Sequence, residues 1–212
     1  HRLYDQALMV RMRPFGDGLA VFPRMVRDVA NTLGKRVRFE VIGDNTKVDR
    51  DIMERLDAPL GHLLRNAVDH GIETPEVRLA SGKSAEGVIR VDAHHSAGTL
   101  QISVSDDGAG IDIEHIRARV VSHRFADVPT AERLTESELL EFLFLPGFTM
   151  KEEVSDISGR GVGLDVVREM IKQVGGNVTI TAQPGQGTRF QLQLPLTLSV
   201  IRALLVEISD EP

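Results

Sequence analysis

The segment HLLRNAVDHGIE at positions 62–73 sets polar side chains at helical spacing among apolar ones. His62, Asn66 and His70 would project from a helix as a column, because residues four apart are neighbours on its surface. Leucine, alanine and valine side chains fall on the opposite side. Asn, Asp and His form helices less readily than the Lys and Glu that usually cover a solvated face. The pattern therefore allows two interpretations, a ligand-binding face or a solvated face whose histidines are incidental.

A second candidate site is DDGAGI at 106–111, which directly follows an alternating, strand-like run. Gly108 and Gly110 could let the backbone approach a flat ligand, because glycine has no Cβ. Asp106 would then accept a hydrogen bond from an amino group such as that of adenine. The alternative is a tight turn in which the glycines only supply positive φ angles.

Two further glycine motifs lie later in the chain. GRGVGL at 159–164 precedes a helical pattern, and the N–H groups at a helix N-terminus readily bind anions. The motif lacks the Lys-Ser/Thr ending of a Walker loop and the preceding strand of a dinucleotide fold, so both are disfavoured. GQGT at 185–188, taken alone, is typical of a hairpin turn.

The elements that must position these motifs alternate between helical and strand patterns. The column at 62–70 should follow a helix that is capped by Asp49 and kinks or restarts at Pro59. It should end at Gly71, placed for the positive φ of a helix C-terminus. We further expect helices over 1–33 (interrupted at 14–18), 113–123, 135–145 and 164–174, strands at 36–43, 88–94, 99–105, 177–182, 188–196 and 198–208, and a long loop over 146–163. This order predicts an α+β fold with a mainly antiparallel sheet covered on one face by helices.

Composition excludes several classes of function. A net charge of −6 over 212 residues disfavours binding to duplex nucleic acid. No apolar run approaches the roughly 20 residues of a membrane span, and no signal peptide is visible. The absence of cysteine excludes disulfides, thiol catalysis and cysteine-ligated zinc, and a cytoplasmic location is the default. Because the sequence begins at His1, we expect it to be a piece of a longer protein.

Taken in order, the motifs resemble the four boxes of the GHKL ATP-binding fold shared by histidine kinases, gyrase, Hsp90 and MutL. Longer stretches resemble the CheA, chemotaxis-type histidine kinases; they are MVRMRP, FPRMVRDVA, PLGHLLRNAVDHGIE, FLFLPGFTMKEEVSDISGRGVGLDVV and LPLTLSVIRALLV. The resemblance implies a two-layer α/β sandwich of the Bergerat type. It also implies the end of a dimerisation helical region at 1–12, a kinase domain at 13–195 and the start of a CheW-like regulatory domain at 196–212.

The resemblance assigns catalytic roles to matching positions. Asn66 resembles the magnesium-binding asparagine, whose amide oxygen suits a hard cation. His62 stands where ordinary sensor kinases and GHKL ATPases carry a glutamate, and it would accept a proton in transfer or contact phosphate. Arg65 would add positive charge at the phosphates, and Lys151 lies in the loop that reaches the γ-phosphate. The expected catalytic set is His62, Arg65, Asn66 and Lys151, with Asn66 as the metal ligand.

Nucleotide-binding roles follow in the same way. Asp106 resembles the adenine-binding aspartate, Thr188 closes the base side, and the glycines of GRGVG resemble those of a lid that wraps the phosphates. Phe144 and Phe148 match the phenylalanine-rich box that packs beneath this lid. The expected nucleotide contacts are Asn66, Asp69, His70, Asp106, Gly108, Gly110, Ile111, Thr149, Lys151, Gly159, Arg160, Gly161, Val162, Gly163, Leu164 and Thr188.

The resemblance implies a protein-histidine kinase core that binds ATP and Mg²⁺ and transfers the γ-phosphate to a histidine on a separate phosphotransfer domain. Its implied partners are that domain, a downstream response regulator, and a CheW-like coupling protein with its receptor array. The full-length protein would be a homodimer and this piece a monomer. Two alternatives are a GHKL ATPase clamp and a catalytically silent nucleotide-binding scaffold. Histidine rather than glutamate at position 62 counts against the clamp, and the intact motifs count against the silent scaffold.

Overall fold

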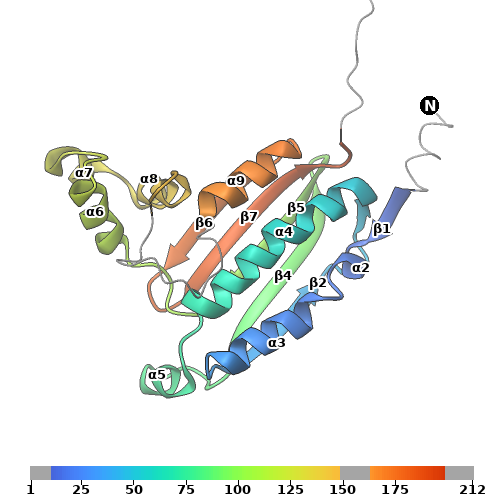
Figure 1. The fold of residues 1–212 in the computed structure, drawn as a ribbon, viewed down its shortest axis with the longest axis horizontal. Helices are drawn as coiled ribbons and strands as arrows, with labels where there is room; N and C mark the ends of the chain where they lie inside the picture. The colour runs from blue at the N-terminus through green and yellow to red at the C-terminus, as the bar shows by residue number, and fades with distance from the viewer. Residues whose placement is uncertain (1–10, 149–162, 199–212) are drawn as a thin grey trace, which may run out of the picture.

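The architecture is a five-stranded sheet with helices across one of its faces (Figure 1). The computed structural model describes residues 11–148 and 163–198. The strand order is β2-β4-β5-β7-β6, where β2 (Val37–Ile42) runs parallel to β4 (Gly87–Ser96). The pairs of β4 with β5 (Thr99–Asp106), of β5 with β7 (Gly187–Pro195) and of β7 with β6 (Asn177–Gln183) are antiparallel. The predicted α+β class and mainly antiparallel sheet are confirmed.

Period-two alternation decides which side of the sheet is covered. Apolar side chains form cross-strand rows on one face, such as Ile102 opposite Leu192, which in turn lies opposite Val178. The neighbouring rows on the other face are polar and include Gln101, Gln193 and Asn177. Because successive side chains in a strand point to opposite faces, the apolar rows form the core and the polar rows meet solvent.

Three helices close the core over the apolar face (Figure 1). They are α3 (Phe22–Thr32), α4 (Arg50–Asn66) and α9 (Leu164–Gln173). Each buries one apolar stripe, which in α4 includes Ile52, Leu56 and Leu63. Short helices lie at the left of the same view. They are α6 (Ile113–Ser122), α7 (Val128–Arg133) and α8 (Glu136–Glu141), and a 3-10 turn, η2 (Phe142–Phe144), follows α8. The remaining elements are α5 (Pro75–Ala80), β1 (Met12–Pro14), α2 (Phe15–Gly18) and β3 (Lys47–Asp49), and β1 pairs with β3.

Both predicted hairpins are present. The turn between β4 and β5 places Ala97 and Gly98 at φ angles of 49° and 75°, the left-handed pair that a two-residue hairpin requires. Asp49 caps α4 as predicted, because its carboxylate accepts from the backbone N–H of Asp51 at 2.8 Å.

Several local predictions were wrong. Pro59 lies inside α4, so the predicted restart of the helix at this residue does not occur. The interrupted helix expected near the N-terminus contains strand β1, and α2 begins directly after Pro14. Helix α7 was not predicted. The expected strand at 198–208, the end of the dimerisation region and most of the long loop at 146–163 lie outside the described residues.

The end of α4 differs most from the expectation. After Asn66 the chain widens into one π-helical turn, η1 (Ala67–Gly71), in which the N–H of Ile72 donates to the carbonyl of Ala67 at 2.8 Å. Lys35 donates to the carbonyl oxygens of Val68 and Asp69 at 2.8 and 2.7 Å. A cation at this helix end stabilises carbonyl groups that otherwise lack donors. Burial lowers the pKa of Lys35, against the attraction of Asp69 and Glu73.

Within residues 11–148 and 163–198, no helix has the length and apolar character needed to cross a bilayer.

Candidate functional site

Asp106 occupies a core-facing position at the end of a buried strand. It continues the alternation of Leu100, Ile102 and Val104 along β5, so its carboxyl group points to the helix-covered side. The carboxyl accepts from the backbone N–H of Gly108 at 2.9 Å and from the backbone N–H of Thr188. Two amides therefore fix this acid, and its other lone pairs remain for a donor on a ligand.

Burial changes the ionisation of this carboxyl. The pKa of Asp106 is raised to about 6, chiefly by removal from water and in smaller part by the negative charges of Asp107 and Glu73. The hydrogen bonds from Gly108 and Thr188 act in the opposite direction. A carboxyl group with this pKa is mostly ionised at neutral pH, so it is an acceptor.

Glycines surround Asp106 because the backbone approaches it from three sides. A Cβ atom at Gly71 would lie 2.8 Å from Cγ of Asp106, and one at Gly187 would lie 1.9 Å from its carbonyl oxygen. A Cβ at Gly108 would lie 2.0 Å from the carbonyl oxygen of Gly71. The predicted close approach of backbone at Gly108 is thus present, although between protein segments. Gly71 is not among the glycines with positive φ, so that prediction was wrong and the acid beside it accounts for the need for glycine.

Gly110 serves both of the predicted purposes, a positive φ and a close approach of backbone. Its φ is +72°, and a Cβ there would lie 2.1 Å from the carbonyl oxygen of Gln183. The N–H of Gly185 donates to the carbonyl of Ala109 at 2.7 Å. The DxGxG and GxGT motifs therefore lie against each other at the ends of β5 and β7.

The residues expected at the phosphates lie on α4 and η1. His62, Arg65 and Asn66 are in the last two turns of α4, and Asn66 is half-buried. Asp69 and His70 follow in η1 and contact each other, with 3.1 Å between Nε2 and Oδ2. The π turn changes the helical register after Asn66.

His62 and Arg65 also border a groove of about 460 Å³ between α3 and α4, opposite Phe22 and Met25. The Nε2 atom of His62 is shielded from solvent. A role in transfer would therefore use Nδ1 or require the imidazole to rotate. Four residues of η1 separate Asn66 from Gly71, where a Cβ atom would lie 2.8 Å from Cγ of Asp106. The residues predicted to bind the phosphates and those around Asp106 are thus connected by the single π-helical turn η1.

The remaining predicted residues divide into two sets. Gly163 is the N-cap residue of α9, which begins at Leu164 as predicted, and Leu164 and Ile111 pack against the core. Phe144 and Phe148 are buried. Thr149, Lys151, Gly159, Arg160, Gly161 and Val162 lie outside the described residues.

A hollow of about 450 Å³ opens near Asp106 but on the uncovered face of the sheet. Its lining includes Arg90, Ser105, Thr181 and Arg189. Asp106 and Thr188 also line this hollow, so it adjoins the site built around that acid.

Magnesium would find a suitable but incomplete donor set. Among residues 11–148 and 163–198, no group of three or more His, Cys, Asp or Glu could hold a metal ion. Asn66 offers an amide oxygen of the kind that Mg²⁺ accepts, and Mg²⁺ commonly takes its other ligands from substrate phosphates and water. The residues present therefore fit a metal that arrives with a nucleotide.

Four charged residues behind the DxGxG loop were not predicted from the sequence. They are Glu73, Arg78, Lys83 and Asp107, which join α5 and the segments beside it to the loop after β5. An inverted pattern in α5 signals them: Arg78 is 1% exposed, whereas Val77 and Leu79 are 55% and 61% exposed. A six-residue helix is too short for that inversion to stand out in the sequence.

Comparisons with known proteins agree with this geometry. Residues 53–198 match the family described as "Histidine kinase-, DNA gyrase B-, and HSP90-like ATPase". Chemotaxis protein CheA of Salmonella typhimurium is 42% identical over 209 residues, which are 99% of this chain and 31% of that protein. CheA of Bacillus subtilis is 41% identical over 204 residues, covering 96% of this chain and 30% of that protein. The chain therefore spans about a third of the length of these relatives.

Solved structures share the fold. A nucleotide-free catalytic domain of histidine kinase ThkA aligns with a TM-score of 0.52 and 17% identity, covering 89% of this chain and 97% of that one. Histidine kinase AdeS of Acinetobacter baumannii aligns with a TM-score of 0.50 and 14% identity, covering 87% and 66%. At these identities the likeness concerns the fold alone.

Proposed function

The chain belongs to the family of histidine kinase-, DNA gyrase B- and HSP90-like ATPases, and from this membership we propose that it is the ATP-binding core of a CheA-type protein-histidine kinase. The family match and the CheA relatives confirm the resemblance predicted from the four motifs. The acceptor of the γ-phosphate, in this proposal, is a histidine on a separate phosphotransfer domain.

The observation that carries the proposal is the arrangement of Asp106. An ionisable acid faces the covered side of the sheet, held by two backbone amides and bordered by glycines. Such an acid accepts a hydrogen bond from the amino group of adenine, and the close backbone leaves a flat surface beside it. Thr188 supports the same role, because its side chain is buried beside this acid and its N–H holds the carboxyl.

On the phosphate side we assign binding to Asn66, Arg65, Asp69 and His70. Mg²⁺, when bound, would neutralise part of the negative charge on the phosphates. Asn66 would hold it through its amide oxygen, and the guanidinium of Arg65 would pair with a phosphate oxygen. The expected contacts at Thr149, Lys151 and 159–162, with those at Gly163 and Leu164, belong to the same proposal.

Transfer itself is an in-line displacement. The imidazole nitrogen of the incoming histidine forms a bond to the γ-phosphorus while the bond from that phosphorus to the bridging oxygen breaks, and ADP leaves with the electron pair. Phosphoryl transfer asks the protein chiefly to position the groups and stabilise charge. His62 would orient the incoming group or accept its proton, since an imidazole titrates near neutrality.

Two alternative functions, an ATPase clamp and a silent scaffold, can be distinguished from the kinase. An ATPase clamp would release phosphate without a partner, but it needs a base that activates water, and histidine stands at the expected glutamate position. A silent scaffold would bind nucleotide and transfer nothing. The Asp106 arrangement supports binding in all three cases, whereas the identity of residue 62 favours the kinase.

The deciding experiment is a transfer assay with ATP labelled at its γ-phosphate. The 212-residue chain is mixed with a phosphotransfer domain, and a domain whose acceptor histidine is replaced by glutamine is the control. We expect label on the intact domain only. Steady phosphate release without a partner would support the clamp, and binding without transfer or release would support the scaffold.

The larger assembly follows as part of the proposal. We place the kinase domain at 13–195, between the end of a dimerisation region at 1–12 and a CheW-like domain that begins at 196. A response regulator, a CheW-like coupling protein and a receptor array would be the cytoplasmic partners of a dimeric whole protein. The present chain would be a monomer.

A further inference from the structure

The buried charged cluster behind the DxGxG loop has no part in the function proposed above. Arg78 is 1% exposed and donates to the carboxylates of Glu73 and Asp107 at 3.0 and 2.9 Å. It also donates to the carbonyl oxygens of Ser84 and Asp107, at 2.7 and 3.2 Å. A fully buried guanidinium is retained only where such acceptors satisfy it.

Lys83 extends the cluster onto the backbone of the loop. Its ammonium group donates to Glu73 at 2.7 Å and to the carbonyl oxygens of Asp107 and Gly108 at 3.0 and 2.7 Å. Asp107 in turn accepts from the N–H of Val88 at 2.8 Å. Two cations and two carboxylates thus form a neutral group whose donors converge on two successive carbonyls of the loop.

The peptide groups held in this way are those that orient Asp106. The carbonyl of Gly108 belongs to the same peptide as the N–H of Ala109, which donates to Gly71 at 2.9 Å. The N–H of Gly108 donates to the carboxyl of Asp106. If Lys83 released the two carbonyls, both peptide planes could turn, and the acid would lose its fixed direction.

We propose that Lys83 and Arg78 are positioning residues for base recognition, which hold the loop so that the carboxyl of Asp106 discriminates adenine by its amino group. This inference rests on the proposed function, in which Asp106 meets the base. The donors of Lys83 and Arg78 end on Glu73, Asp107 and backbone carbonyls, so these two cations act on Asp106 through the loop. The assigned phosphate-side residues Arg65 and Asn66 lie on α4, and Asp69 and His70 lie on η1. Neither cation of the cluster donates to these four residues in the hydrogen bonds given above, so loss of the cluster should affect the base more than the phosphates.

The test compares two ligands that differ by one amino group. Dissociation constants for ATP and for purine riboside triphosphate, which is ATP without that group, are measured by calorimetry on the 212-residue chain. The dissociation constant for purine riboside triphosphate divided by that for ATP reports base discrimination. We expect Lys83→Met to lower this ratio by about fivefold to tenfold, the effect of one well-placed hydrogen bond. Lys83→Arg, which keeps a cationic donor, should recover part of it.

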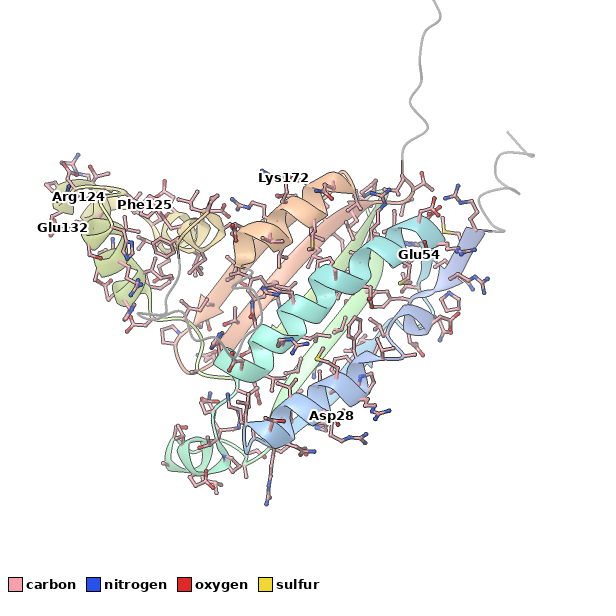
Figure 2. The ribbon with its side chains drawn as sticks, viewed as in Figure 1. Asp28, Glu54, Arg124, Phe125, Glu132 and Lys172 are labelled. Atoms are coloured by element: carbon pink, nitrogen blue, oxygen red, sulfur yellow. The ribbon has the colours of Figure 1, made fainter. Side chains whose placement is uncertain are left out.

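The matched control is Lys172→Met, because Lys172 is an exposed lysine on the outer side of α9 (Figure 2). Its ratio should equal that of the unmodified chain. A merely structural cluster would lower the melting temperature of Lys83→Met and weaken both ligands equally, and that result would overturn the proposal. An unchanged ratio in folded Lys83→Met would overturn it as well.

Should Lys83→Met fail to fold, Lys83→Gln decides by the same ratio, since its polar side chain lacks the charge and the reach of the ammonium group. A reduced ratio supports the proposal and an unchanged ratio overturns it. The ratio in Asp106→Asn separates the positioning role from base reading itself. If neither that variant nor the unmodified chain discriminates the ligands, base reading by Asp106 fails; if Asp106→Asn alone loses discrimination, only the positioning role fails.

Discussion

At the scale of single residues, burial of Asp106 lowers the stability of the fold but provides a hydrogen-bond acceptor inside it. Its pKa is raised from 3.8 to about 6, so between these values the folded chain keeps a proton that the unfolded chain has released. Stability therefore falls as pH rises through this window and is constant above it. A carboxyl group with this property is a cost to the fold that binding must offset.

Asp106→Asn should remove that pH dependence. Relative to the variant, the unmodified chain should lose roughly 2 kcal/mol of unfolding free energy between pH about 4 and pH about 6. Urea denaturation of both proteins across this range measures the difference. A constant difference would mean that the carboxyl is solvated and that burial does not raise its pKa. For ATP the sign is opposite, because the ionised carboxylate is a stronger acceptor than the protonated acid, so ATP affinity should rise with pH through about 6.

Asn66→Ala tests the metal side separately. The variant should fold normally, since the side chain is half-buried at the end of α4, but lose most magnesium-dependent transfer. Label on the phosphotransfer domain measures the loss, and the melting temperature serves as the control. Normal transfer in the folded variant would remove Asn66 from its assigned role.

Residue patterns predicted some of these positions and missed others for physical reasons. Asp106 and Gly108 stand out locally, because an acid that ends a strand and a glycine two residues later form a recognisable short pattern. Gly71 was assigned to a helix terminus, since its actual neighbour, Asp106, is distant in sequence. Arg78 was missed because its burial depends on acceptors from three segments that only the folded chain brings together.

At the scale of elements, α4 and η1 form one continuous helical segment that contains Gly61 and Gly71. A side chain can be accommodated at Gly61 but not at Gly71. A Cβ at Gly61 would meet Phe22 at an ordinary 3.4 Å, whereas one at Gly71 would meet Asp106 at 2.8 Å. Gly61→Ala should therefore stabilise the chain by up to about 1 kcal/mol, because alanine favours the helix. Gly71→Ala should lower ATP affinity. Thermal melts and calorimetry on the two variants measure these effects, and equal behaviour would contradict the contact at Gly71.

Strands and long helices were predicted more accurately than the joints between them. Alternation fixed β4, β5, β6 and β7 within a few residues, because cross-strand burial follows a simple period. The π turn of η1 was not foreseen, since it depends on Lys35 from a separate segment donating to its carbonyls. Continuity of α4 through Pro59 also reflects tertiary packing, as Pro59 is buried.

At the scale of the whole molecule, the helices of residues 11–148 and 163–198 cover one side of the sheet, and adjacent residues of β7 test this. Leu192 is fully buried between Ile102 and Val178, whereas Gln193 is exposed on the other face. Leu192→Ala should cost roughly 2–5 kcal/mol of unfolding free energy. Gln193→Ala should change it by at most about 0.5 kcal/mol. Similar costs in denaturant titrations would mean that something also covers the polar face.

The overall fold class was predictable because the order of helices and hairpins limits the packing to a covered sheet. The parallel pairing of β2 with β4 was not predicted from the sequence, since it depends on how α4 crosses between the two strands.

The junction of β5 and β7 carries a kinetic consequence. Each strand belongs to a hairpin that is local in sequence, but Ser105 meets Arg189 only when the two hairpins dock. Such distant pairings form late, because a long loop must close first. A nucleotide held across this seam, by Asp106 on one side and Thr188 on the other, would recognise only the completed chain. The concentration of the nucleotide would then determine the unfolding rate of the chain, while the folding rate would stay nearly constant.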